Sequence, residues 1–258
     1  MKKLLKPLHW LLRVQLGLDP LRMLRTFKGM PRYAANWMTF RKRYSGRLGM
    51  LPCLHDWHEN NAAATDEYFW QDLHVAQLIH RAQPTKHVDI GSRIDGFVAH
   101  VASFRQIEVF DIRPLGSAVP GVVFKRADLM NPADTPIGYC DSLSCLHALE
   151  HFGLGRYGDP IDAHGYATGL NNMARMLLPG GRFYLSVPLG EERVEFNAHR
   201  IFNPHLLLRL AAANGLTLQD FAWIGPGQTL VQSSRIEQDM DEIAGLPHTL
   251  GIFTFVKQ

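Results

Sequence analysis

HVDIGSRIDGFVAHVASFRQIEVFD, residues 87–111, holds the pattern that decides the fold. A short apolar strand, residues 87–90, runs into a turn at Gly91, and an apolar helical pattern follows over residues 97–102. A second strand then delivers Asp111 at its carboxyl end. Strand, tight turn, helix and strand in this order predict a β-α-β unit of a parallel sheet.

Acidic side chains accompany each of the first three strands. Asp89 lies within the first strand, Asp111 ends the second, and Asp128 follows a third strand at residues 122–124. In an open parallel sheet, ligands bind outside the carboxyl ends of the strands, so we expect the acids and the turn at Gly91 to meet in one crevice. A carboxylate accepts hydrogen bonds from both hydroxyls of a ribose, and a glycine lets the backbone approach a ligand where a Cβ would collide. The pattern therefore predicts a site for an adenosine-containing cofactor.

The rest of the chain continues the alternation of helices and strands. The further elements that we expect are helices at residues 66–81, 161–178 and 204–214 and strands at residues 142–146, 182–187, 216–223 and 251–256. Pro179-Gly180-Gly181 ends the second of these helices. Together these elements predict an α/β fold with a doubly wound, mostly parallel, seven-stranded sheet.

The acids, together with Leu-Pro-Gly-Gly-Arg-Phe before the fifth strand, resemble the class I S-adenosylmethionine-dependent methyltransferases over residues 68–257. The resemblance implies S-adenosylmethionine as the cofactor. It implies that Asp89 and Gly91 shape the loop near the methionine moiety, that Asp111 holds the ribose hydroxyls, and that Asp128 faces the adenine amino group. The full cofactor site that it implies is Asp89, Gly91, Ser92, Arg93, Gly96, Asp111, Ile112, Asp128, Leu129 and Leu146.

The loop after Gly91 departs from the family pattern. The family has two further glycines soon after this position, whereas Ser92-Arg93-Ile94-Asp95 intervene here before Gly96. Arg93 is bulky and cationic, so it either grips the carboxylate of the cofactor or fills the space and leaves a site without cofactor.

Two motifs in the chain match other classes of enzyme. His147-Ala-Leu-Glu-His151 matches the H-x-x-E-H pattern of inverted zinc peptidases, but it leaves a strand and meets Gly153 within two residues, so a metal-binding helix is not expected. Residues 153–158 match G-x-G-x-x-G, but Asp159-Pro160 follows where a dinucleotide-binding helix would begin. We therefore predict no metal site and a shaped loop beside the active site.

Residues 147–160 and 197–200 also resemble a bacterial family of uncharacterised methyltransferase-like proteins, often described as a domain of unknown function. That family is loosely associated with surface-polysaccharide genes. The association is a hint about substrate only, and it points to a saccharide.

Titratable and cationic side chains gather at the carboxyl ends of the fourth and fifth strands. They are His147, Glu150, His151, Arg156, Tyr157, His199 and Arg200. An alcohol acceptor benefits from a base that removes its proton, and histidine titrates in the useful range. We predict His151 as this base, oriented by Glu150, with His199 as the second candidate and His147 in the same catalytic group. For each histidine, a structural role is the alternative.

The cations of this cluster indicate how the acceptor is held. We expect Arg156 and Arg200, with Tyr157, to bind an anionic acceptor such as a sugar phosphate or a uronate.

Charge is distributed unequally along the chain. Residues 1–48 contain 12 Lys and Arg and a single acid, Asp19, a net charge of +11, while the rest of the chain is net −8. A helix at the very start would carry one basic stripe formed by Lys2, Lys6, His9 and Arg13. Its leucines fall elsewhere, which is typical of a segment lying on an anionic membrane surface. RNA contact and a helical lid with a solvated basic face are the alternatives, and no recognised RNA module accompanies the charge.

Length and composition bound the organisation of the chain. With 258 residues and 46% hydrophobic content, we expect one main domain at residues 65–258 and a basic helical arm with a linker at residues 1–64. No apolar run approaches the roughly 18 residues of a spanning helix. The three cysteines lack a C-x-x-C spacing, and no small-residue cleavage site suggests secretion. We expect a cytoplasmic protein, peripheral on the inner face of the membrane.

These patterns predict an S-adenosylmethionine-dependent methyltransferase that acts on an oxygen atom of a saccharide or another hydroxylated acceptor. The expected partners are a small-molecule or lipid-linked saccharide and an anionic membrane surface, and nucleic acid is not expected. One alternative is a non-catalytic binding or scaffold protein on the same fold. The other is an RNA methyltransferase that uses the basic arm.

Overall fold

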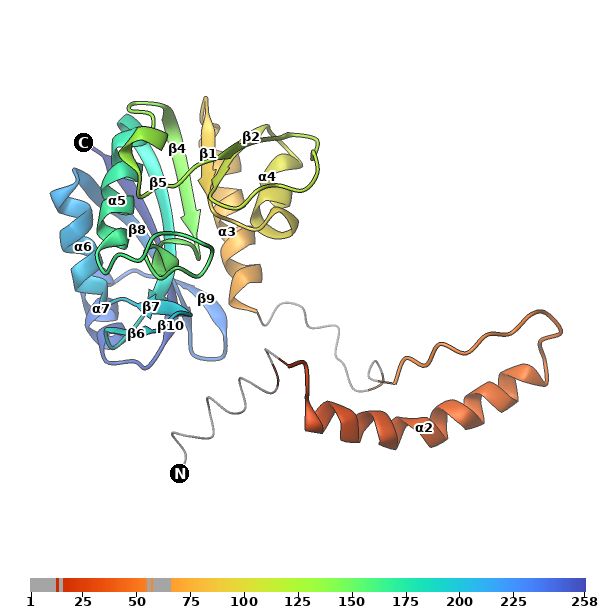
Figure 1. Ribbon diagram of the computed structural model, residues 1–258. Helices are drawn as coiled ribbons and strands as arrows, with labels where there is room; N and C mark the ends of the chain where they lie inside the picture. The colour runs from red at the N-terminus through yellow and green to blue at the C-terminus, as the bar shows by residue number, and fades with distance from the viewer. Residues whose placement is uncertain (1–12, 14–15, 55–56, 58–65) are drawn as a thin grey trace. The chain divides into compact units, whose positions relative to one another are not determined.

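The chain divides into two compact units, Met1–Ala62 and Ala63–Gln258. The computed structural model describes residues 13, 16–54, 57 and 66–258 (Figure 1). In the first unit the main element is helix α2 (Pro20–Arg41). Most of the basic stripe that we expect near the start of the chain lies outside the described residues.

The second unit is built on an eight-stranded sheet in the order β3-β2-β1-β4-β5-β10-β8-β9. Its strands are β1 (His87–Ile90), β2 (Ile107–Asp111), β3 (Val122–Arg126), β4 (Cys140–Leu146), β5 (Leu177–Leu189), β8 (Leu216–Gly225), β9 (Thr229–Gln232) and β10 (Thr249–Lys257). The first five are mutually parallel, and β10 runs antiparallel to β5 and β8. The predicted α/β fold with a mostly parallel sheet is confirmed.

The prediction of seven strands is wrong by one, because β9 adds an edge to the sheet. β9 pairs antiparallel with β8 through a tight turn in which Gly227 and Gln228 have φ of +79° and +57°. A short, half-exposed edge strand buries little apolar surface, so its sequence carries a weak periodic signal. A separate hairpin of β6 (Arg193–Glu195) and β7 (His199–Ile201) also has no counterpart among the expected elements.

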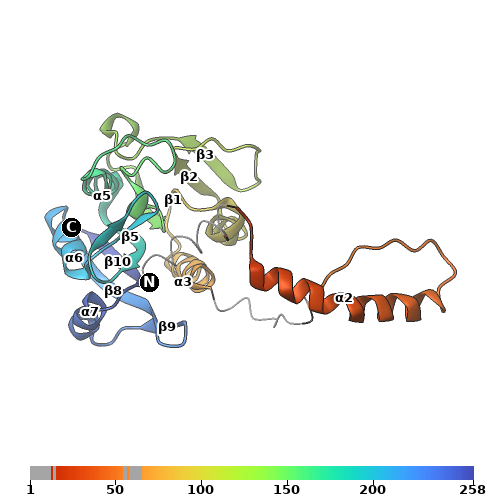
Figure 2. The same cartoon turned by 60° about the horizontal axis from the view of Figure 1, so that its bottom comes forward.

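Helices cover both faces of the sheet (Figures 1 and 2). One face carries α3 (Glu67–Ala82), the π-helical turn η4 (Ile94–Val98) and α4 (Ala99–Ala102). The other carries α5 (Gly165–Met176), α6 (Pro204–Ala213) and α7 (Ile236–Ala244). The core accordingly falls into two clusters, one around Ile79 and Val109 and the other around Met173 and Phe253.

The helix boundaries follow from capping. α3 begins after its N-cap Asp66, whose carboxylate accepts from the backbone N–H of Tyr68 at 3.1 Å, and α6 begins after Asn203 with a proline in its first turn. α5 starts four residues later than expected and ends at Met176, since Leu177 already has extended backbone and enters β5.

The connections of the sheet create the site. From β1 the chain moves outward to β2 and β3, and then crosses back to β4 on the other side of β1. Neighbouring connections therefore diverge at the carboxyl ends of β1 and β4, which is where an open sheet leaves a crevice for a ligand.

Candidate cofactor and acceptor site

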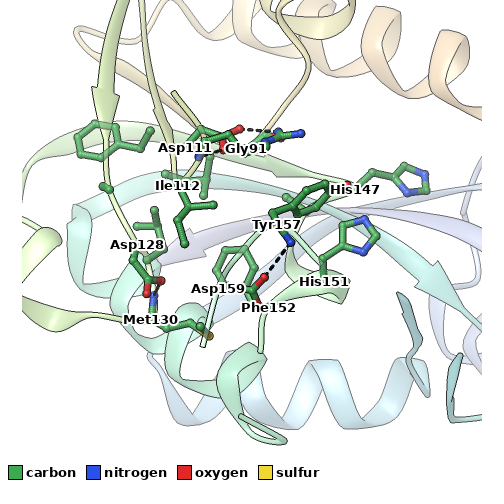
Figure 3. Close-up of a pocket in the computed structure, with 16 residues that line it drawn as sticks. Gly91, Asp111, Ile112, Asp128, Met130, His147, His151, Phe152, Tyr157 and Asp159 are labelled. Atoms are coloured by element: carbon green, nitrogen blue, oxygen red, sulfur yellow. Dashed lines mark hydrogen bonds and ion pairs between the residues drawn. The ribbon is translucent and has the colours of Figure 1, made fainter. Parts of the chain in front are cut away.

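Two adjoining cavities open at the carboxyl ends of β1, β2 and β4. The first, of about 520 Å³, is drawn in Figure 3. The second, of about 1370 Å³, lies beside α3 and the loop after β1. Both are lined by Gly91, Arg113, His147, His151 and Tyr157, so these residues stand where the cavities meet.

The first cavity is apolar with acids at its edge. Its walls include Ile112, Leu129 and Phe152, and it is also lined by Asp111 and Asp128. The side chains labelled in Figure 3 converge on it from β2, from the loop after β3 and from the loop after β4. Apolar walls suit a flat aromatic base, and carboxylates suit its amino and hydroxyl groups.

Gly91 is required by the local geometry. Its φ is +75°, and a Cβ at this position would lie 2.9 Å from the Cβ of Ala148. A side chain here is both strained and obstructed, so the turn keeps the passage beside β1 open.

Asp89 lies beneath the loop and lines neither cavity. Its side chain is fully buried and accepts hydrogen bonds from the N–H of Ser92 at 3.0 Å, from its hydroxyl at 2.8 Å, and from the hydroxyl of Ser144 at 2.5 Å. Burial raises the pKa of Asp89 to about 7, against the lowering effect of these bonds. Asp89 therefore positions the loop that carries Gly91 and Ser92. Asp89 itself does not reach the second cavity, but Ser92, which donates to it, lines that cavity.

Asp111 is engaged by Arg113, a residue that has no role in the sequence prediction. The Asp111 carboxylate accepts from the Arg113 backbone N–H at 2.8 Å, from Nε at 3.0 Å and from Nη2 at 2.5 Å. The guanidinium also lies 4.5 Å from the centre of the Tyr157 ring. The acid expected to hold ribose hydroxyls is thus already paired, and Arg113 bridges it to the loop after β4.

Asp128 has one oxygen engaged. The N–H of Met130 donates to Oδ1 of Asp128 at 2.9 Å, which fixes the carboxylate at the mouth of the first cavity. The backbone of Asp128 is held in turn by Asp134 at 3.1 Å. No hydrogen bond to Oδ2 of Asp128 is formed within the described residues, so this oxygen is left for a donor in the cavity.

Arg93 does not fill the loop. Its guanidinium forms two hydrogen bonds with Asp95, at 3.0 and 2.8 Å, and its side chain is 76% exposed at the rim of the second cavity. The alternative in which Arg93 occupies the cofactor space is therefore wrong. Gly96 and Leu146, also expected in the cofactor site, line the same cavity.

The first turns of α3 form a polar wall of the second cavity. Asp72 lies against Gly96, where an added Cβ would be 2.8 Å from Oδ2, and Gln71 donates to Asp72 at 2.9 Å. Ser186 of β5 donates to Gln71. Burial raises the pKa of Asp72 above its ordinary value. Tyr68, one turn earlier, has its ring 4.4 Å from that of His147.

His147 and Glu150 form a buried pair at the end of β4. His147 has φ of +51°, and its Nδ1 lies 3.0 Å from Oε1 of Glu150. Burial lowers the pKa of His147, but the hydrogen bond and the charge of Glu150, with those of Glu67 and Asp72, raise it more, so the net shift is upward. Burial raises the pKa of Glu150, and His147 lowers it below the ordinary value.

Two atoms of this pair form no hydrogen bond. Among the described residues, Nε2 of His147 and Oε2 of Glu150 are buried without a hydrogen-bond partner. His147 lines both cavities, whereas Glu150 lines neither. Nε2 of His147 lies 3.8 Å from Oε1 of Glu67, which is an ion-pair distance for a protonated ring but too long for a hydrogen bond. Because buried polar atoms are ordinarily satisfied, Nε2 is the ring atom available to a group in the cavities.

His151 is held differently. Its Nδ1 donates to the backbone carbonyl of Ala198 at 2.8 Å, and its Nε2 lies 3.6 Å from Oε1 of Glu150. Burial, with the nearby charge of Arg156, lowers the pKa of His151 below its ordinary value. Glu150, which we expect to orient His151, therefore contacts both histidines, and its hydrogen bond goes to His147. Glu150 orients His147, and the β6–β7 turn orients His151.

Asp159 shapes the glycine loop after β4. Its carboxylate accepts from the N–H groups of Gly153, Gly155 and Tyr157 at 2.8, 3.1 and 3.1 Å. The loop presents Tyr157 to both cavities and Arg156 to the second. Arg156 also donates to the carbonyl of Ala198 at 2.7 Å. The expected shaped loop is therefore present. The N–H groups of its two glycines, Gly153 and Gly155, donate to the carboxylate of Asp159 rather than to a phosphate.

Arg200 and His199 line neither cavity. Arg200 is buried and donates to the carbonyl oxygens of Phe152 at 2.5 Å and of Glu150, Asp162 and Ala163 at 3.4 Å each. Arg200, which we expect to bind the acceptor, is not placed to do so in either cavity, because its guanidinium holds the loop through these carbonyl oxygens. His199 lies on β7 with its ring 6.3 Å from that of His248, and its second-candidate role as base has no support from this position.

The H-x-x-E-H motif is not arranged for zinc. Only residues 149–151 form a 3-10 turn, and His147 precedes it with a positive φ, so the two histidines do not share a helical face. Within the part of the chain that the structure describes, no group of three His, Cys, Asp or Glu side chains is placed to hold a metal ion.

Part of the chain matches the model of a family of unknown function, and many solved structures share its fold. Residues 125–241 match the model of the family described as "Caenorhabditis protein of unknown function, DUF268". That range includes the loop after β4 and the β6–β7 hairpin, but not Gly91 or Asp111. A search of curated proteins finds no match.

Several solved structures share the fold of the chain. The 1,6-didemethyltoxoflavin-N1-methyltransferase of Burkholderia thailandensis, solved with S-adenosylhomocysteine, has a TM-score of 0.53 at 17% identity, covering 82% of this chain and 93% of that chain. The N-methyltransferase NodS of Bradyrhizobium japonicum, also with S-adenosylhomocysteine, has 0.50 at 15% identity, covering 78% and 93%. The [4+2]-cyclase SpnF has 0.51 at 14% identity, covering 71% and 80%.

Proposed function

The chain has the class I methyltransferase fold, and we propose that it is an S-adenosylmethionine-dependent methyltransferase acting on an oxygen atom of a hydroxylated, anionic acceptor. The observation that carries this proposal is Nε2 of His147, which has no hydrogen-bond partner among the described residues, while Glu150 holds Nδ1 of the same ring at the junction of the two cavities. A shared fold alone does not fix an activity, which depends on the residues of the site.

The residues present fit the cofactor. Gly91 leaves the space that a side chain would obstruct, the first cavity offers apolar walls for adenine, and Asp111 and Asp128 lie at its edge for hydroxyl and amino groups. The methyltransferases compared above, with S-adenosylhomocysteine in their structures, support S-adenosylmethionine as the cofactor. When bound, it supplies an electrophilic methyl group.

His147 acts as the general base in this proposal. With Nδ1 held by Glu150, the neutral ring presents Nε2 as the acceptor for the proton of an acceptor hydroxyl. Glu150 stabilises the imidazolium that forms, because it is buried at hydrogen-bond distance. Positioning by the loop and by Tyr68 restricts the ring to this orientation.

The second cavity accommodates the acceptor. Arg93 is paired with Asp95 and Arg113 with Asp111. Among the described residues, Arg156 instead donates to the neutral carbonyl oxygen of Ala198 and lies 3.4 Å from Nδ1 of His151, with no carboxylate as partner. The charge of Arg156 is therefore available to a phosphate or carboxylate. A saccharide that carries such a group, free or lipid-linked, fits a roomy cavity with polar walls.

The Asp111–Arg113 ion pair favours a second candidate, a binding protein that uses this fold without methyl transfer. In that case Arg113 stays hydrogen-bonded to Asp111, the carboxylate that would otherwise accept from the ribose hydroxyls. The two candidates differ in whether S-adenosylhomocysteine binds the native protein.

The experiment that tests the proposal measures methyl transfer from labelled S-adenosylmethionine to uronates and sugar phosphates. We expect His147→Asn to lower kcat by about 10²–10⁴-fold, the usual contribution of a general base, and to change the affinity for S-adenosylhomocysteine far less. His151→Asn is the matched control, and we expect a smaller loss. Equal losses in both variants would contradict the assignment of His147.

A further inference from the structure

We propose that helix α2 is a membrane-surface element that lies flat on a bilayer rich in anionic lipid. The inference concerns the first unit alone and is independent of the proposed methyl transfer. It rests on the distribution of apolar and basic side chains around α2.

One face of α2 is apolar and open to solvent. Met23, Phe27 and Met30 follow the i, i+4, i+7 spacing of one helix face, and Leu24 and Met38 lie on the adjacent row. All five side chains are more than half exposed, and Phe27 reaches 64%. Single exposed apolar residues are common, but a contiguous row of this kind marks an interaction surface.

The opposite face of α2 is basic. Arg22, Arg25, Lys28 and Arg32 follow i, i+3, i+6 and i+10, and the helix contains no acid. Its cap, Asp19, is the single acid among the described residues of the first unit, which carry nine Lys and Arg and a net charge of +8. Asp19 is itself paired with Arg13 at 3.1 Å.

The chain of the first unit covers only one side of the helix. Leu54 packs on Gly29, where an added Cβ would lie 3.2 Å from the Leu54 carbonyl, and Arg32 stacks 4.6 Å from the Trp57 ring. An apolar groove of about 780 Å³ extends from Met30 to Met50 between these segments. The row of Met23 and Phe27 is not covered by this packing.

These features fit a bilayer surface better than a nucleic acid. With 22 residues α2 is about 33 Å long. Within the described residues, no helix is apolar enough over sufficient length to cross a membrane. An amphipathic helix with a charged face lies in the interface, where the apolar row meets acyl chains and the cations meet anionic head groups. RNA would engage the basic face and leave the apolar row in water.

Vesicle sedimentation of the full chain tests the proposal. We expect binding to phosphatidylcholine vesicles that contain about one third phosphatidylglycerol, weakening with salt, and at least tenfold weaker binding to pure phosphatidylcholine. Arg25→Glu with Lys28→Glu should lower the partition coefficient at least tenfold, and Phe27→Asn should lower it several-fold.

Two controls match these changes in the second unit. Arg175→Glu with Arg209→Glu changes the net charge by the same amount on exposed positions of α5 and α6. Ile137→Asn removes an apolar side chain that is 69% exposed, against 64% for Phe27. We expect both to bind as the native chain does, and circular dichroism shows whether each variant keeps its helix content. The proposal is overturned if the native chain binds no anionic vesicle, even where it binds RNA. It is equally overturned if Phe27→Asn binds anionic vesicles as tightly as the native chain does. The same holds if the partition coefficients of the controls fall as much as those of the α2 variants.

Discussion

His147 and His151 differ in what each ring already contacts, and this difference assigns the base. His151 uses Nδ1 on the carbonyl of Ala198 and has a lowered pKa, whereas His147 uses Nδ1 on Glu150 and has a raised pKa. A base paired with a buried carboxylate becomes stronger, because the carboxylate stabilises the protonated ring. His147 is the better placed of the two.

The pH dependence of methyl transfer follows from this pair. His147 must be neutral to accept a proton, so kcat should fall as pH drops through its pKa, which lies above the ordinary 6.5. Glu150→Gln removes the charge that does most to raise the pKa of His147. The acid limb of the kcat profile should therefore move to lower pH, and the plateau rate should fall. An acid limb that does not move in Glu150→Gln would rule out His147 as the titrating group.

Arg113 competes with a ribose for Asp111. A carboxylate has about four lone-pair sites, and Arg113 uses three of them. We expect Arg113→Gln to free Asp111 and tighten binding of S-adenosylhomocysteine by roughly three- to tenfold, given the strength of charge-assisted hydrogen bonds. Calorimetric titration measures this change. Weaker binding in Arg113→Gln would show instead that Arg113 helps to hold the cofactor.

The loop after β4 is held in place by hydrogen bonds with two charged side chains, one an acceptor and the other a donor. Asp159 collects three of its N–H groups, and Arg200 ties its start to residues 162 and 163. Because the loop carries Arg156 and Tyr157, its order sets the shape of the acceptor cavity.

Arg200 and Arg156 should therefore respond differently to the same substitution. Arg200→Gln leaves buried carbonyls unpaired and should lower the free energy of unfolding by about 2–4 kcal/mol, at 1–3 kcal/mol for each unsatisfied group. Arg156→Gln should leave stability nearly unchanged and raise the KM of an anionic acceptor. Urea denaturation and steady-state kinetics on both variants give these quantities. An unchanged free energy of unfolding in Arg200→Gln would return Arg200 to the acceptor site.

Strands and turns with strong local signals could be predicted from sequence, and contacts between distant side chains could not. The apolar runs at β1, β2 and β4 and the turn at Gly91 are local, so their order fixed the fold class. The Asp111–Arg113 pair involves a side chain two residues away that no periodicity marks, and the choice of Glu150 between two histidines depends on the φ of His147. Asp159 had a usable signal, because an Asp after a glycine loop commonly caps the backbone.

Across the whole second unit, buried titratable groups couple stability to pH. His87 is enclosed in the sheet, and burial lowers its pKa to about 3. Between pH 6.5 and 3 the unfolded chain binds a proton that the folded chain does not, so the His87 contribution is lost as pH falls through this range. Asp89 acts in the opposite sense, since its raised pKa of about 7 makes the folded chain hold a proton that the unfolded chain releases above 3.8.

A variant separates these two effects. From pH 7 to pH 5, the native protein should lose up to about 2 kcal/mol of unfolding free energy relative to His87→Gln, at 1.36 kcal/mol per pH unit below 6.5. Chemical denaturation at both pH values gives the change in unfolding free energy with pH for each protein, and the two changes are compared. Parallel pH profiles for the two proteins would contradict a neutral buried His87.

Calorimetric titration of the native protein with S-adenosylhomocysteine tests the proposed cofactor site most directly. We predict saturable binding with one site per chain, weakened by about tenfold or more in Asp111→Asn, where a charged acceptor for ribose hydroxyls is lost. Asp220→Asn, at an exposed position of β8, is a carboxylate control that lines neither cavity. Absence of binding to the folded native protein would contradict the account and leave this fold serving a function other than methyl transfer.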